Sequence, residues 1–155
     1  MLVLTACNSI SVNEEFDEYR STVIEPLNEK SIKIGEMSGR YTTLLEETEE
    51  AYNLLNEELI PFTKEARELA VDAKDSLVNE EIKQLNDILI NNFDLTIESF
   101  TMSAEMTKLN IPPINDVEEV YEETEEIYNE LLELQKEIES ASAEFDAKIN
   151  ELDED

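Results

Sequence analysis

The sequence has little of what most catalytic and metal sites require. Its 155 residues include no histidine, no tryptophan, one cysteine, two glycines and four prolines. Without histidine, the usual base of a nucleophilic triad is missing and a zinc site lacks its most common nitrogen ligand. Gly35 and Gly39 do not form a glycine-rich phosphate loop. Paired carboxylates are so frequent in this chain that they single out no general acid or base. We therefore expect no enzyme, no catalytic residue, no cofactor and no metal site.

Positive charge is also scarce. Eleven Lys and Arg face 40 Asp and Glu, which gives a formal net charge of −29 at pH 7. Such a surface repels phosphate, so the charge argues against nucleic-acid binding and against docking of the protein surface on anionic lipids. Hydrophobic residues still make up 41% of the chain. This content favours a folded domain over a disordered one.

The single cysteine closes a short apolar segment at the start of the chain. The run Leu4-Thr5-Ala6-Cys7 is followed at once by polar residues. It resembles the lipobox of bacterial lipoproteins, in which small residues precede a cysteine that becomes a thioether to diacylglycerol. We interpret residues 1–6 as an incomplete signal peptide, because a complete one has a basic start and about 7–15 apolar residues. Cys7 is the predicted lipidation site, and the alternative is an ordinary free or buried cysteine.

The closing segment has the clearest helical period. Its apolar and small residues alternate steps of three and four, which is typical of a helix seam. The seam consists of Val117, Tyr121, Thr124, Tyr128, Leu131, Gln135, Ile138, Ser142, Phe145, Ile149 and Leu152. A second column of Val120, Ile127, Leu134 and Ala141 runs beside it and widens the predicted core face. Asn115 or Asp116 is the expected N-cap, and the pattern predicts a helix over 116–152.

Two further helices are expected upstream. A seam with steps of three and four runs from Met37 to Leu77 and stays in phase through Pro61, so it predicts one continuous helix kinked at that proline. Residues 12–23 form a helical lead-in that is interrupted near Pro26. A third helix follows the N-cap Asn79 and ends by Asn110, since Ile111-Pro112-Pro113-Ile114 cannot continue a helix.

These patterns predict an all-α fold. Three long helices joined by short turns pack antiparallel, with coiled-coil-like contacts between them. We therefore expect an elongated antiparallel three-helix bundle over residues 14–155, preceded by a lipidated tether over residues 7–13.

The densest acidic run lies at the start of the closing helix. Nine Asp and Glu and no Lys or Arg occur between Asp116 and Glu133. A divalent-cation site would need several of these carboxylates to converge. The simpler interpretation is a solvated outer face, because no loop preorganises the ligands, and we favour it.

The order of these segments resembles a family. The stretch Leu77-Val78-Asn79-Glu80-Glu81-Ile82-Lys83-Gln84-Leu85 precedes an aromatic-bearing helix, a Pro-containing linker and a Glu-rich closing helix. Together with the segment from Leu4 to Cys7, this resembles the helical cell-wall-binding lipoproteins of Gram-positive bacteria and a related group with a Glu-Met-Tyr-Tyr motif. Here Glu105-Met106 is followed by Thr107-Lys108 instead of two tyrosines. The resemblance implies a lipid-anchored helical bundle on the outer, extracytoplasmic face of the cell membrane.

Three functions follow as hypotheses. The first is a non-enzymatic lipoprotein that binds or scaffolds a cell-wall component or a basic envelope protein, with Cys7 anchored in the membrane through diacylglycerol. The second is an acidic binding module for divalent cations or for a basic partner protein. The third is a soluble coiled-coil oligomerisation protein.

Overall fold

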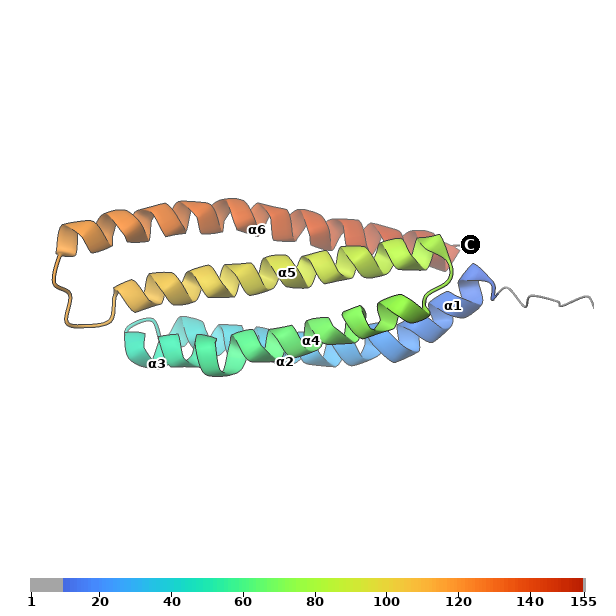
Figure 1. Ribbon diagram of the computed structural model, residues 1–155, viewed down its shortest axis with the longest axis horizontal. Coiled ribbons are helices and arrows are strands. Elements are labelled where there is room, and N and C mark those ends of the chain that lie inside the picture. Colours follow the sequence, from blue (N-terminus) through green and yellow to red (C-terminus); the bar gives the residue numbers. More distant parts are fainter. Residues whose placement is uncertain (1–9, 155) are drawn as a thin grey trace, which may run out of the picture.

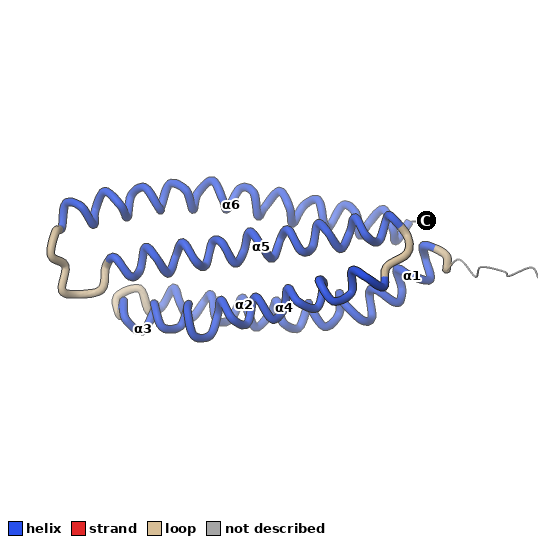
Figure 2. Tube along the Cα trace, in the orientation of Figure 1, coloured by secondary structure: helices blue, strands red, loops and turns tan. Residues whose placement is uncertain are grey.

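The computed structural model describes residues 10–154, which form four long antiparallel helices (Figure 1). The first helix comprises α1 (Val12–Tyr19), the π-helical segment η1 (Arg20–Ile24) and α2 (Glu25–Thr43). The second comprises α3 (Thr48–Asn53), the π-helical segment η2 (Leu54–Leu59), α4 (Ile60–Ala73) and the 3-10 turn η3 (Lys74–Ser76). The third is α5 (Glu80–Leu109) and the fourth is α6 (Val117–Glu154). The part of the chain that the structure describes contains no strand (Figure 2).

The bundle is elongated, and its two ends differ. The 38 residues of α6 span about 57 Å at 1.5 Å per residue. Ile10 and Glu154 lie at one end, which we call the terminal end (Figure 1). The connections over residues 44–47 and 110–116 lie at the opposite end, which we call the turn end. Of the helices within residues 10–154, none combines the length and the apolar character needed to cross a membrane.

The expected all-α antiparallel bundle is confirmed, but it has four helices instead of three. The predicted single helix from Met37 to Leu77 is wrong, because the chain reverses between Thr43 and Thr48. Leu44 N–H donates to Tyr41 O at 3.0 Å, and Glu47 N–H donates to Leu44 O at 2.8 Å. None of the turn residues has a positive φ, so the turn needs no glycine or asparagine to mark it.

Both helix-interior prolines are accommodated by a π-helical turn. The predicted continuity through Pro61 is confirmed, whereas the predicted interruption near Pro26 is wrong. Glu25 N–H bonds to Arg20 O, and Ile60 N–H bonds to Leu55 O, each five residues back. The wider turn lets the helix continue past a residue that cannot donate a hydrogen bond.

The boundaries of the last two helices agree with the sequence analysis. α5 begins after Asn79 and ends at Leu109, and Asp116 Oδ1 caps α6 by accepting the N–H groups of Glu118 and Glu119 at 3.1 Å each. The side chain of Asn79, however, makes no cap hydrogen bond to α5. Instead its Nδ2 donates to Ile10 O at 3.4 Å.

The core lies among the first helix, the second helix and α5. Its fully buried side chains include Tyr19, Leu55, Leu59, Ile82 and Leu85. α6 packs along α5 and shares no comparable interface with the other helices. Its buried residues are Leu134, Ala141 and Leu152. The fourth helix is therefore an outer layer attached mainly to the third.

This one-sided packing corrects the predicted seam of α6. Val117, Tyr121 and Tyr128 are 72%, 68% and 53% exposed. The neighbouring column, which was expected only to widen the core face, is the better buried of the two, since Leu134 and Ala141 are buried. A helix that packs against a single neighbour buries a narrower stripe than one enclosed in a closed bundle.

Candidate binding groove

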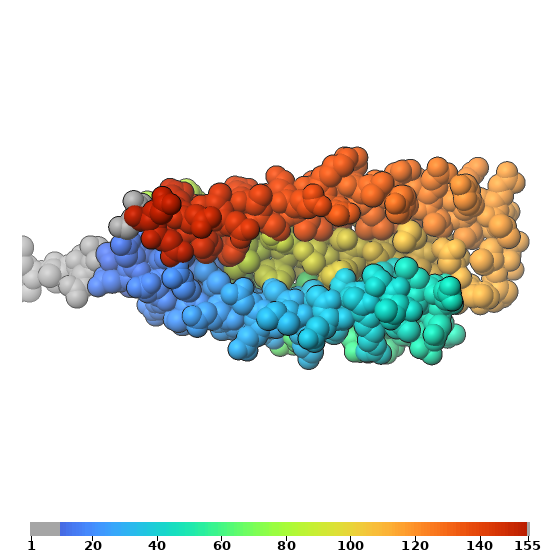
Figure 3. Space-filling model, turned by 180° about the vertical axis from the view of Figure 1, so that it is seen from behind, coloured from blue at the N-terminus to red at the C-terminus, as the bar shows by residue number. Residues whose placement is uncertain are grey.

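The first helix and α6 border an open groove along one side of the bundle. In Figure 3 a furrow runs between α6 (orange to red) and the first helix (blue to cyan), with α5 (yellow) at its floor. The two walls are joined near the terminal end, where Arg20 pairs with Asp153 and Leu152 enters the main core. We call this feature the α2–α6 groove.

A cavity of about 310 Å³ lies within the groove. Its apolar lining comes from all three elements and includes Leu27, Leu89, Phe93 and Phe145. This volume is at the small end of the range for ligand sites, about 300–1,000 Å³. The groove can therefore accept an apolar side chain or a short apolar group.

Polar side chains surround this apolar lining. Asn28, Ser31 and Asp146 line the cavity, as do Asn92 and Ser142. Asn92 Nδ2 donates to Ser142 Oγ at 2.9 Å, which joins the floor to the α6 wall.

The α2 wall includes a row of small residues beside the larger Leu27 and Ile34. Ser31 lines the cavity, and Gly35 and Ser38 follow at steps of four and three, so they continue the same face toward the turn end. A Cβ added to Gly35 would meet nothing within 4 Å. A helix lying in the groove could approach this wall closely.

The α6 wall carries exposed apolar residues toward the turn end. Tyr121, Tyr128, Gln135 and Ser142 are spaced seven apart, which keeps them on one face of a helix that packs on its neighbour in heptads. Ser142 lines the cavity, and this spacing places both tyrosines on the same face of α6, nearer the turn end. Val117 and Leu132 lie close to this column and are also exposed.

The start of α6 carries charge of one sign. The nine carboxylates between Asp116 and Glu133 are all exposed, in agreement with the favoured interpretation of a solvated face. Within residues 10–154, no group of three or more His, Cys, Asp or Glu is placed to hold a metal ion.

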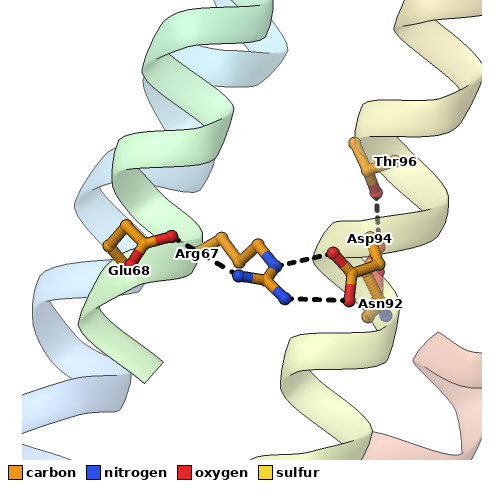
Figure 4. Close-up of polar contacts among 5 residues, drawn as sticks. All are labelled: Arg67, Glu68, Asn92, Asp94 and Thr96. Atoms are coloured by element: carbon orange, nitrogen blue, oxygen red, sulfur yellow. Dashed lines mark hydrogen bonds and ion pairs between the residues drawn. The ribbon is translucent and has the colours of Figure 1, made fainter. Parts of the chain in front are cut away.

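Several cations lie away from the groove, against the second helix. Lys30 Nζ pairs with Glu65 Oε1 at 2.7 Å, and Lys33 Nζ lies 4.6 Å from the ring centre of Phe62. Arg67 on α4 binds Asp94 on α5 through two hydrogen bonds of 2.6 and 3.2 Å (Figure 4). The hydrogen bonds to Asp94 raise the pKa of Arg67. These contacts hold the first three helices together.

The buried polar groups are fully paired, which is typical of structural contacts. Tyr19 Oη donates to Asn86 Oδ1 at 2.9 Å, and Asn86 Nδ2 donates to Ala70 O at 3.0 Å. Burial raises the pKa of Tyr19. Among the described residues no buried side-chain nitrogen or oxygen lacks a hydrogen-bond partner.

Glu15 on α1 binds the backbone immediately before α5. Its two carboxylate oxygens accept the N–H groups of Val78 at 2.5 Å and Asn79 at 2.7 Å. Burial acts to raise the pKa of Glu15, but these hydrogen bonds and the charge of Lys83 outweigh it and lower the pKa. The carboxylate is therefore held ionised as a structural cap.

The sequence analysis and the structure overlap little in their candidate sites. Cys7, the predicted lipidation site, lies outside the described residues. The groove was not anticipated, because the seam containing Tyr121 and Tyr128 was assigned to the core. The signal that could have revealed it is the second apolar column beside that seam, since a helix with two columns can bury one and present the other.

No family model matches the chain, and neither the curated proteins nor the solved structures include one similar to it.

Proposed function

We propose that this chain is a non-enzymatic, lipid-anchored module on the outer face of the cell membrane that binds or scaffolds a partner in the cell envelope. The observation that carries the proposal is the run Leu4-Thr5-Ala6-Cys7 placed just before a folded rod. Ile10 lies at the terminal end of that rod. A diacylglycerol on Cys7 would therefore be attached near one end of a body about 57 Å long.

The geometry suits a spacer that presents a binding surface. With the anchor near the terminal end, the exposed residues Val117 and Tyr121 lie at the other end of the bundle, where α6 begins. An anionic wall polymer would be repelled by the net charge of −29, which favours a basic protein as the partner.

The anchor is tested by metabolic labelling of the full chain in its native host with an alkyne fatty acid. The native protein and a Ser9→Ala control should carry label, and Cys7→Ala should carry none, because Cys7 is the only cysteine. Label that persists in Cys7→Ala, or that is absent from the native protein, would remove the lipoprotein proposal.

A second candidate function is a binding module for a basic protein that needs no anchor. The exposed apolar column on α6, set among carboxylates, favours it. A native chain that carries no lipid but binds a lysine-rich peptide in solution would support this candidate over the first.

A further inference from the structure

We propose that the first half of α6, residues 117–133, is an arm that leaves α5 and unfolds when its carboxylates repel one another, and that docks again as a helix when this repulsion is screened. We call these residues the acidic arm. The second half of α6, residues 134–154, stays packed on the bundle throughout. The inference goes beyond the proposed function and does not depend on it.

The first argument is the uneven burial of α6. Its three buried residues, Leu134, Ala141 and Leu152, all lie in the second half, and Leu152 belongs to the main core. None of residues 117–133 is buried. Because most of the stability of a helix in a protein comes from packing its apolar face, the acidic arm gains less from the bundle than the rest of α6.

The second argument is the small number of polar contacts that hold the arm. Within residues 10–154, one hydrogen bond between side chains joins it to the chain before α6, from Asn110 Nδ2 to Thr124 Oγ1 at 3.3 Å. No ion pair in this part of the chain joins the arm to another helix, whereas Asp153 in the second half pairs with Arg20 on the first helix. The arm is therefore fastened less firmly than the segment that follows it.

The third argument is the charge of the arm. It contains eight Glu, all exposed, and no Lys or Arg. Several of these, such as Glu122, Glu126 and Glu130, are four residues apart, a spacing at which like charges destabilise a helix. Only the last of the eight, Glu133, forms an ion pair, with Lys136 just beyond the arm. A short helix with this charge is marginal without packing, so release from α5 and unfolding coincide.

The position of the arm lets it open while the core stays closed. The main core lies among the first helix, the second helix and α5, and α6 is an outer layer. The connection over residues 110–116 joins the arm to α5 at the turn end (Figure 1). In the proposed lipoprotein, the arm would thus lie at the end farthest from the anchor and would be controlled by the ionic surroundings there.

Hydrogen–deuterium exchange of the full, unacylated chain tests the proposal segment by segment. Exchange is followed by mass spectrometry at about 0.01 M and about 1 M salt, where the screening length is about 30 Å and about 3 Å. The protection factor of each segment is its exchange rate in the unfolded chain at the same salt concentration, divided by its rate in the native protein. This ratio removes the direct effect of charge and salt on the exchange chemistry.

At low salt, we expect the protection factor of the acidic arm to be at least about tenfold lower than that of residues 134–152, because local opening needs less free energy than opening of the core. High salt should raise the protection factor of the arm. The triple variant Glu123→Gln/Glu126→Gln/Glu130→Gln should raise it at low salt by about fivefold or more, since it removes several like-charge pairs. The same variant should respond less to added salt.

The matched control is Glu137→Gln/Glu139→Gln/Glu144→Gln, which removes three exposed charges from the second half of α6. Both triple variants have the same net charge, so a general relief of repulsion would affect the arm equally in the two. We expect the control variant to leave the protection factor of the arm within about twofold of the native value, because its substitutions lie outside the arm.

Four results would overturn the proposal. Equal protection of the arm and residues 134–152 at low salt would mean that α6 opens as one unit. Protection that declines steadily toward Val117, instead of being low throughout the arm, would mean that only the helix end frays. An arm that does not respond to salt, or that gains as much protection in the control variant as in the arm variant, would show that repulsion within the arm does not govern its release.

Discussion

Tyr19 and Asn86 are joined by a buried hydrogen bond of 2.9 Å across 67 positions of the sequence. Asn86 in turn donates to the carbonyl of Ala70 at 3.0 Å. One fully buried amide thus connects the first helix, the second helix and α5 within the core. Apolar contacts alone tolerate sliding of one helix along another, whereas a buried polar contact is satisfied in only one register.

Removing the Tyr19 hydroxyl should test that connection. Tyr19→Phe keeps the ring but leaves Asn86 Oδ1 without its partner, so the free energy of unfolding should fall by about 1–3 kcal/mol. Urea denaturation measures the free energy of unfolding of this variant. The control is Tyr128→Phe, which removes a hydroxyl from an exposed tyrosine. Equal stability of the two variants would show that the hydroxyl contributes nothing to the fold.

The cap provided by Glu15 should depend on pH. Its folded pKa is lowered, so its contribution is present above the unfolded pKa, about 4.3, and is lost as the pH falls through the folded pKa. At pH 7, Glu15→Gln should reduce the free energy of unfolding by on the order of 1 kcal/mol. The difference between the native protein and the variant should shrink in acid.

Denaturant melts of the native protein and Glu15→Gln at several pH values give this difference directly. Glu122→Gln, which removes an exposed charge on α6, is the control. A Glu15 difference that is constant from neutral to acid pH would mean that the carboxylate charge has no role in the cap.

Added salt should stabilise the protein. A net charge of −29 on a slender bundle produces self-repulsion, which screening relieves. The melting temperature in thermal denaturation by circular dichroism should rise by several degrees between low and high salt, since about 1 kcal/mol shifts a domain of this size by a few degrees. An unchanged melting temperature would show that the charges are effectively paired or too far apart to repel.

The orientation of α6 predicts that substitutions in its two neighbouring columns destabilise the protein to different extents. Leu134 is buried, whereas Tyr128 is 53% exposed. Leu134→Ala should reduce the free energy of unfolding by about 2–3 kcal/mol. Tyr128→Ser should change it by less than about 0.5 kcal/mol. Urea denaturation of both variants gives the two losses of free energy of unfolding. A larger loss for Tyr128→Ser than for Leu134→Ala would mean that Tyr128, and not Leu134, packs in the core.

The helical class and the last two helices could be predicted from the sequence because their signals are local. The period of three and four from Ile82 onward, the two prolines at 112 and 113, and the Asp116 cap act within a few residues of the positions they define. Continuity through Pro61 was also predictable, because the apolar period stays in phase across the proline.

Tertiary contacts decided the number of helices. The reversal over residues 44–47 contains no glycine or proline, and the apolar period continues through it in phase. Only the packing of the first helix against the second distinguishes two short antiparallel helices from one long helix. The cap before α5 also depends on a tertiary contact, since Glu15 comes from a distant part of the chain.

Which of the two apolar columns of α6 is buried likewise depends on the helices that pack against it. Periodicity identifies an apolar face but does not say how many helices cover it. The chain's own pattern thus established long amphipathic helices and their ends, which depend on local hydrogen bonding and side-chain spacing. The assembled bundle alone determined that α6 packs mainly against α5 and that Tyr121 and Tyr128 stay exposed, because burial is a property of several helices together.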